Sequence, residues 1–222
     1  SYFGLTLTLA IFWISHIGCR KLKISILNPI LISSAIIIII LLCLDISYDT
    51  YEAGADLISK LLTPATICYA VPLYRQIEIL KKQFVTIMIS VACGSIASVL
   101  CVFGFSKLFH YPPEIYTALL PKSVTTAIGM GVSEELGGIV PITVAAIIVT
   151  GLFGSAIAVA ICRLFKITDP VAKGLAIGTA SHAVGTSKAI ELGEVEGAMS
   201  GLAIVVAGLL TVVLSQIASG WI

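Results

Sequence analysis

Five stretches without a single Lys, Arg, Asp or Glu set the strongest limit on how this chain can fold. They cover residues 1–19, 24–44, 83–106, 136–162 and 197–222. Each is long enough to cross a bilayer as a helix, because about 20 apolar residues cover the hydrocarbon core. Five such helices cannot all be core helices of a soluble globular protein. The sequence therefore predicts an all-α polytopic membrane protein that lies in the lipid bilayer.

The composition excludes several classes of protein. Of the 222 residues only 11% are charged, against roughly 25% in an ordinary soluble domain. A soluble enzyme or a disordered regulator is therefore excluded, and a net charge of +1 argues against a nucleic-acid partner. The six cysteines lie in or beside apolar runs without CxxC spacing, so we interpret them as small buried hydrophobes. We predict no metal and no cofactor other than a coupling H+ or Na+.

Two shorter apolar segments contain helix-breaking residues. A third segment, 113–133, contains Pro121 and Lys122 among apolar residues. Segment 61–74 contains two prolines, and segment 174–187 contains three glycines and His182. Both are predicted to cross as broken helices, whose freed backbone groups need protein or water as partners. Segment 113–133 either crosses once or is re-entrant.

The loop charges decide between these alternatives, because Lys and Arg prefer cytoplasmic loops. A re-entrant segment 113–133 places every basic loop inside, whereas a full crossing would move one outside. We therefore predict about 7–8 transmembrane segments, with seven net spans and the amino terminus outside. The basic loops contain Arg20, Lys21, Lys23, Arg75, Lys81, Lys82, Arg163 and Lys166. The acidic loops, predicted to be outside, contain Asp45, Asp49, Glu52, Asp56, Glu134, Glu135, Glu191, Glu194 and Glu196.

This topology predicts two inverted units within one transmembrane domain, 1–222. The units cover about 29–107 and 137–219, and each has a broken helix at its centre. Inverted units with discontinuous helices are typical of secondary transporters, whose substrate lies where the breaks meet. The alternative is that Pro and Gly are simply commoner in membrane helices than in soluble ones.

Four motifs of this chain form a specific combination. They are Pro121-Lys-Ser-Val-Thr-Thr126, Gly137-Gly-Ile-Val-Pro141, Thr150-Gly-Leu-Phe-Gly154 and Ala180-Ser-His-Ala-Val-Gly-Thr186 running on to Glu191. Together they resemble the LrgB/CidB family. Asn28-Pro29 and Val71-Pro-Leu-Tyr74 extend the likeness over nearly the whole chain. One departure is Ala127, where the family is expected to carry a proline that would break the helix.

The resemblance implies a fold, a location and two kinds of function. The family is similar to the plastid glycolate/glycerate translocator and to bacterial pyruvate carriers, and it modulates murein hydrolases and autolysis alongside a small holin-like partner. Its members look akin to antiporter and bile-acid symporter folds with crossed broken helices. We expect a homo-oligomer in the cytoplasmic (inner) membrane, with an LrgA/CidA-like protein as a potential partner.

Lys122 defines the first candidate site, together with Ser123, Thr125 and Thr126. A lysine at the bilayer centre costs about 2.5 to 3.5 kcal/mol on insertion scales, and a small organic anion as substrate would offset that cost. The alternative is a shallow Lys122 whose ammonium group snorkels to the headgroups.

The second candidate site contains Ser181, His182, Gly185, Thr186 and Lys188. If the helix breaks between Gly178 and Gly185, Thr186 or Ser187 can cap the second half, whose positive end would attract a carboxylate. His182 and Glu191 are candidates for ion coupling, because the ordinary pKa of histidine lies near 6.5. Alternatively, His182 bonds a neighbouring carbonyl, and Lys188 and Glu191 form only an ion pair.

We predict that the protein is no enzyme but an ion-coupled or exchanging carrier of small monocarboxylates such as pyruvate, glycolate or glycerate. The rival hypothesis is a holin-like pore or a regulatory membrane partner of murein hydrolases in autolysis. A pore needs a polar stripe along several helices. Here the polar residues cluster at two helix breaks, which favours a carrier.

Overall fold

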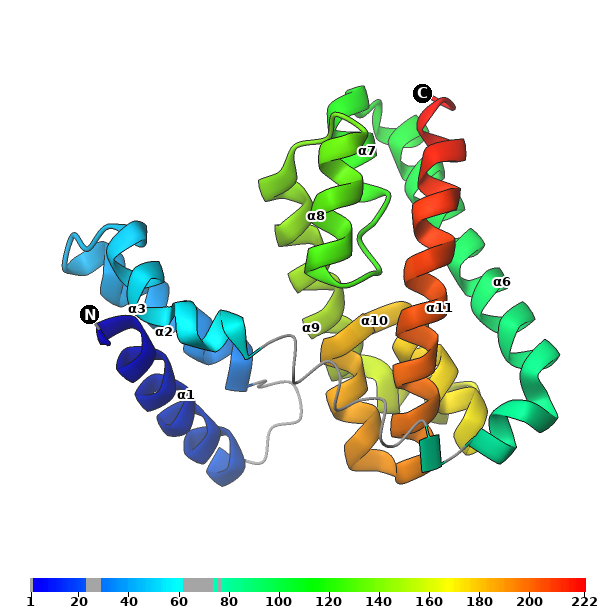
Figure 1. Cartoon of the computed structure of the whole chain (residues 1–222), viewed down its shortest axis with the longest axis horizontal. Coiled ribbons are helices and arrows are strands. Elements are labelled where there is room, and N and C mark those ends of the chain that lie inside the picture. The colour runs from blue at the N-terminus through cyan, green and yellow to red at the C-terminus, as the bar shows by residue number, and fades with distance from the viewer. Residues whose placement is uncertain (1, 23–28, 62–73, 76) are drawn as a thin grey trace. The chain divides into compact units, whose positions relative to one another are not determined.

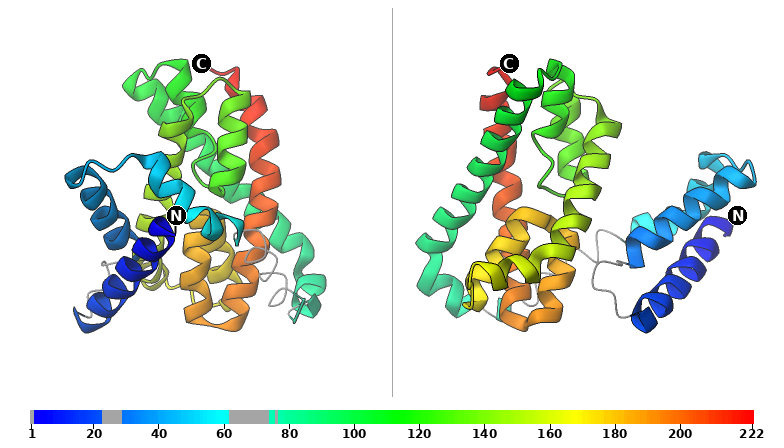
Figure 2. Two further views of the ribbon diagram at one scale, coloured as in Figure 1. Left: turned by 60° about the vertical axis from the view of Figure 1, so that its left-hand side comes forward. Right: turned by 180° about the vertical axis from the view of Figure 1, so that it is seen from behind.

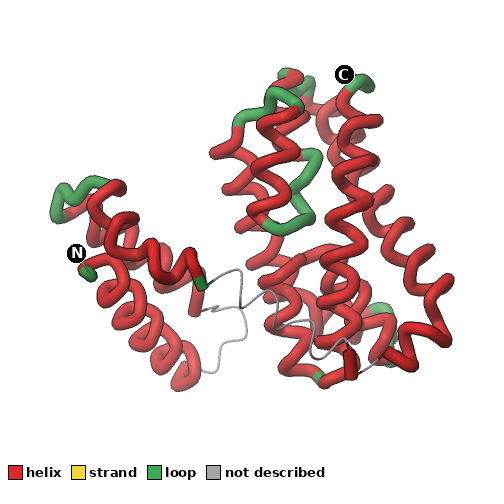
Figure 3. The backbone as a smooth tube through the Cα atoms, in the orientation of Figure 1, coloured by secondary structure: helices red, strands yellow, loops and turns green. Residues whose placement is uncertain are grey.

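The computed structural model describes residues 2–22, 29–61, 74–75 and 77–222, and the described residues form helices and loops without a strand (Figure 3). The chain divides into two compact units, 1–68 and 69–222, which are described separately. This division cuts through the predicted inverted unit 29–107. The predicted proline-broken helix and the motif ending at Tyr74 fall mostly on residues 62–73, outside the described residues, as does Asn28. That half of the inverted repeat stays a prediction.

The described residues of the first unit form the helices α1 (Phe3–Leu22), α2 (Pro29–Cys43) and α3 (Tyr48–Lys60). Helix α1 packs against both α2 and α3 (Figure 2). A Cβ at Gly4 would meet the carbonyl oxygen of Tyr51, so a glycine there permits the close approach of α1 to α3. The Thr8 hydroxyl lies 2.7 Å from the Tyr51 hydroxyl across the same contact.

The second unit is built on three long helices, α6 (Ile77–Phe109), α9 (Val140–Leu164) and α11 (Glu194–Ser219). Among the described residues, these three are long and apolar enough to cross a membrane. Helices α6 and α11 run in one direction and α9 runs in the other (Figure 1). We call the end at which α6 and α11 begin and α9 ends the basic end. Residues of α6, α10 and α11, including Ile87, Leu175 and Met199, form a buried cluster near it.

A short helical hairpin enters this unit from the end opposite the basic end (Figure 1). It consists of α7 (Pro113–Leu119) and α8 (Thr126–Glu135), joined by a turn. The Ile139 N–H donates to the Glu114 carbonyl oxygen at 3.4 Å, so the chain returns to the level at which it entered. Helix α8 begins at Thr126 although Ala127 follows it in place of the expected proline.

Helix α10 (Pro170–Leu192) forms a second hairpin, which reverses at His182. His182 has φ 40° and ψ −136°, a left-handed conformation that ends the first half of the helix. Gly178 before the break and Thr186 after it both meet Ser200 of α11, so the two halves lie side by side. Figures 1 and 2 show the chain folding back.

This reversal corrects the predicted topology of the second half. Segment 170–190 was expected to cross, which would place Glu191, Glu194 and Glu196 away from the basic loops. Instead, a Glu194 carboxylate oxygen lies 3.6 Å from a guanidinium nitrogen of Arg75. The prediction was wrong because glycines and a histidine reveal that a helix breaks but do not reveal the direction in which the chain continues. The inverted repeat of 29–107 and 137–219 itself stays a prediction, because part of 29–107 lies outside the described residues.

We expect single cysteines at positions 82, 166 and 194 to react from the same side of the membrane. In a Cys-free background, Lys82→Cys, Lys166→Cys and Glu194→Cys all lie at the basic end, whereas Glu135→Cys lies at the opposite end. Labelling of oriented vesicles with an impermeant maleimide measures this directly. Position 194 labelling from the side of position 135 would contradict the α10 hairpin.

Candidate functional site

The tips of the two hairpins meet at one cavity of about 720 Å³. The α7–α8 hairpin reaches it from one end of the unit and the α10 hairpin from the basic end (Figure 1). Helices α6 and α9 form the remaining walls. The polar lining residues are Ser90, Ser98, Cys101, Lys122, Ser123, Thr150, Thr179 and Ser181. The structure thus brings part of each predicted cluster to a single place.

Lys122 supplies the cationic side chain of this cavity. Its ammonium group donates to the hydroxyl oxygens of Ser98 at 3.2 Å and Ser123 at 3.1 Å. The two hydroxyls are 3.0 Å apart, so the three groups form a triangle. Among the described residues, no carboxylate lies within ion-pairing distance of Lys122. These neutral partners do not balance the positive charge of the ammonium group, which a bound anion would do.

Small residues make the rest of the cavity possible. Gly94, Gly154 and Ala180 line it, and they leave room where larger side chains would fill the space. A Cβ at Gly94 would meet the methyl group of Thr179, and one at Gly154 would meet the Ser181 hydroxyl. Helices α6 and α9 therefore approach the tip of the α10 hairpin closely on both sides.

His182 lies at the tip of the α10 hairpin but does not line the cavity. Its side chain is 4% exposed, and its Nε2 lies 3.0 Å from the carbonyl oxygen of Ile147. Because a carbonyl oxygen only accepts, the Nε2 must carry a proton and donate it. A Cβ at Gly151 would collide with the imidazole ring, so this glycine creates the space for it. This hydrogen bond links the tip of the hairpin to α9, and the role of His182 in proton coupling stays a prediction.

The other predicted residues of the α10 cluster have packing roles. Thr186 is fully buried, and its hydroxyl donates to the His182 carbonyl oxygen at 3.0 Å. The same hydroxyl lies 2.7 Å from the Ser200 hydroxyl. We had expected Thr186 or Ser187 to cap the second half of the helix, and Thr186 does not. A Cβ at Gly185 would meet Ile177 and Ser181, so the glycine lets the two halves touch.

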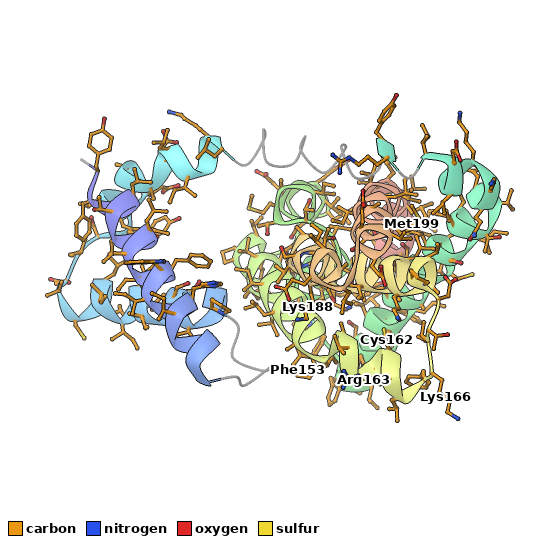
Figure 4. All side chains as sticks on the ribbon, turned by 90° about the horizontal axis from the view of Figure 1, so that it is seen from below. Phe153, Cys162, Arg163, Lys166, Lys188 and Met199 are labelled. Carbon is orange, nitrogen blue, oxygen red and sulfur yellow. The ribbon has the colours of Figure 1, made fainter. Side chains whose placement is uncertain are left out.

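Lys188 and Glu191 lie away from the cavity, near the basic end. The ammonium nitrogen of Lys188 is 2.7 Å from a carboxylate oxygen of Glu191, and both side chains reach solvent. Figure 4 views this end and labels Lys188. The structure does not place them with the predicted substrate and coupling residues, because the reversal at His182 carries them back from the tip. Thr125 and Thr126, which precede and begin α8, also do not line the cavity.

Several residues of this site escaped the sequence reasoning. Ser98 bonds Lys122, yet it lies within a long apolar stretch where a single serine carries little signal. Gly151 and Gly154 appeared only as part of a family motif, although their spacing of three puts both on one face of α9. Small residues on one face of a membrane helix indicate close helix packing, and that signal could have placed α10 against α9.

Two substitutions at position 182 separate backbone strain from the lost hydrogen bond. We expect His182→Ala to unfold more easily than His182→Gly, by about 1 kcal/mol, because only glycine adopts this conformation without steric cost. Both variants lose the bond to Ile147, so the difference between them reports the strain. Thermal unfolding in one detergent measures it. Equal stabilities would contradict the left-handed conformation of His182.

The fold and the cavity define a class: a helical membrane protein in which two opposed hairpins enclose a lysine and several hydroxyl groups. The chain belongs to the LrgB-like family, whose model matches residues 8–221. It is 39% identical to the "Antiholin-like protein LrgB" of Bacillus subtilis (strain 168) over 212 residues, which cover 95% of this chain and 92% of the relative.

Another relative, the "Antiholin-like protein LrgB" of Bacillus cereus (strain B4264), is 37% identical over 213 residues, with 96% and 93% coverage. No solved structure matches the chain. The similarity therefore extends over both units and confirms the family that the sequence motifs indicated.

Proposed function

We propose that this chain is an antiholin-like protein of the cytoplasmic membrane, which restrains murein hydrolases and so limits autolysis. The observation that carries this proposal is the similarity over nearly its whole length to relatives named antiholin-like. An antiholin opposes the opening of membrane pores by a holin. The corresponding partner is a small holin-like membrane protein of the LrgA type.

The distribution of polar groups supports a restraining role over a pore-forming one. A pore needs polar side chains along the length of several helices. In the described part of the second unit, α6 exposes Phe84, Ile89 and Leu100, and α9 exposes Ile148 and Ile161. These apolar faces suit contact with lipid or with another apolar helix, and the polar groups gather at the hairpin tips instead.

Expression in Bacillus subtilis that lacks its own LrgB relative tests this proposal. The chain is expected to slow the fall in optical density after a lytic stimulus and to lower murein hydrolase activity on a zymogram. Gly104→Val is a control variant that should restrain lysis as the unmodified chain does, because a Cβ at Gly104 meets no atom within 4 Å. Unchanged lysis in cells whose membranes contain the protein would overturn the proposal.

The second candidate function is a carrier of small monocarboxylates, which the cavity at Lys122 favours. One cation, several hydroxyls and small apolar walls match a carboxylate with a neighbouring hydroxyl or carbonyl oxygen, as in pyruvate, glycolate or glycerate. Two hairpins that enter from opposite ends give the site two potential routes of access. Coupling to H+ or Na+ is part of this hypothesis, although neither His182 nor Glu191 lines the cavity.

The two functions make separable predictions about Lys122. If restraint of lysis depends on contacts with a membrane partner alone, Lys122→Met leaves it intact while abolishing carboxylate binding. If both activities fall together, the anion in the cavity controls the restraint. The measurement compares zymogram activity and carboxylate uptake for the same variant.

A further inference from the structure

A second cavity, of about 460 Å³, lies at the basic end of the second unit, away from Lys122. Its polar lining includes three cations, Arg163, Lys166 and Lys173, but no carboxylate. Lys173 is half-buried, whereas Arg163 and Lys166 are exposed. Figure 4 views this end and labels Arg163 and Lys166, which lie near one another where α9 ends.

The turn between α9 and α10 brings these cations together. The Lys166 N–H donates to the Arg163 carbonyl oxygen at 3.1 Å, and the Ile167 N–H donates to that of Cys162 at 2.8 Å. Lys166 itself has φ 54°, the left-handed conformation in which this kind of helix end favours glycine. A lysine thus occupies a position where glycine would cost less, and its charge joins that of Arg163.

Within the described part of the chain, the three cations have no anionic partner. Among the described residues, Lys60, Arg75 and Lys188 each form an ion pair, but these three form none. The neighbouring Asp169 caps α10, where its carboxylate accepts a hydrogen bond from the Ala172 N–H at 2.8 Å, and it forms no ion pair with these cations. Like charges held together repel one another, so the arrangement favours binding of an anion from outside the chain.

The remaining walls of this cavity are apolar. Val159, Ile167 and Leu192 line it beside the cations. Because α9 is long and apolar enough to cross a membrane, we expect its last turn at the level of the lipid headgroups. A ligand that fits has a phosphate group for the cations and an apolar portion for these side chains. Basic pockets between membrane helices are suited to such headgroups.

We propose that this cavity binds the phosphate group of an anionic phospholipid. Arg163 forms the directional contacts, since a guanidinium group can donate two parallel hydrogen bonds to phosphate oxygens. Lys166 and Lys173 contribute charge from the turn and from α10. A soluble phosphate would meet the same cations but would leave the apolar walls unused. The bound lipid would hold the α9 end and the α10 hairpin together.

Native mass spectrometry of the purified full chain tests the site, with phosphatidylglycerol and phosphatidylcholine of identical acyl chains. We expect phosphatidylglycerol to bind more tightly. Each of Arg163→Gln, Lys166→Gln and Lys173→Gln should weaken it about fivefold, because one cation near an anionic headgroup contributes about that factor. The matched control is Lys81→Gln/Lys82→Gln, which removes two exposed cations from the same end and is compared with Arg163→Gln/Lys166→Gln.

Three results would overturn the proposal. The first is equal binding of the two lipids by the unmodified chain. The second is an equal loss in the two double variants, which would reveal only the general attraction of a basic end. The third is displacement of the lipid by equimolar inorganic phosphate, which would identify a soluble anion as the ligand. Circular dichroism confirms that each variant is folded before its binding is compared.

Discussion

If the chain carries monocarboxylates, Lys122→Met is expected to reduce uptake of a small monocarboxylate into proteoliposomes to the rate of empty liposomes. Methionine preserves the length of the side chain and removes the charge. The cavity then offers a carboxylate only hydroxyl groups, and burial of an unpaired carboxylate costs several kcal/mol. Ser98 and Ser123 lose the hydrogen bonds that the Lys122 ammonium group donates to them. Their hydroxyls still lie 3.0 Å from each other, so the variant should still fold.

Initial rates of radiolabelled pyruvate and glycolate uptake measure this effect, with size-exclusion chromatography as the folding check. The unmodified chain should saturate, and other short monocarboxylates should compete. Lys107→Met is the matched control, because Lys107 is exposed near the end of α6 and lies 5.8 Å from the Phe103 ring centroid, outside the cavity. Normal uptake by Lys122→Met would assign Lys122 to snorkelling, and non-saturable flux of unrelated solutes would favour a pore.

Gly178→Val is expected to lower the free energy of unfolding by about 3 kcal/mol, because it overpacks the contact between α10 and α11. A Cβ at this position would meet the backbone carbonyl oxygen of Ser200. Backbone atoms of a long helix cannot rotate away as a flexible side chain can, so the two helices must separate. Separation also breaks the hydroxyl contact between Thr186 and Ser200.

The melting temperature in detergent measures this effect, with Gly104→Val as the control. Both changes replace a helical glycine with valine and therefore carry the same small change in helix propensity. Only Gly178 faces another helix closely, whereas Gly104 has open space. Equal melting temperatures would show that α10 does not pack against α11 at this level. A fall in Gly178→Val alone would support the hairpin.

The amino-acid sequence by itself determined the positions of the long helices in the second unit. The charge-free stretches 83–106, 136–162 and 197–222 correspond to α6, α9 and α11, because a membrane-spanning helix needs an unbroken apolar run. Lys122 and Ser181 were also identified from the sequence, since polar side chains within apolar segments carry a clear cost. Both line the same cavity in the structure.

The tertiary structure decided the direction of the chain after each break and the partners of the polar side chains. His182 adopts its left-handed conformation where Gly151 leaves space for the ring and the Ile147 carbonyl accepts its hydrogen bond. Neither neighbour is local in sequence, so no pattern around position 182 could distinguish a crossing from a reversal. The reversal then returns Lys188 and Glu191 to the basic end, where they pair with each other. Hydropathy indicates which segments can lie in lipid. The direction of the chain between these segments depends on contacts between helices that are distant in the sequence.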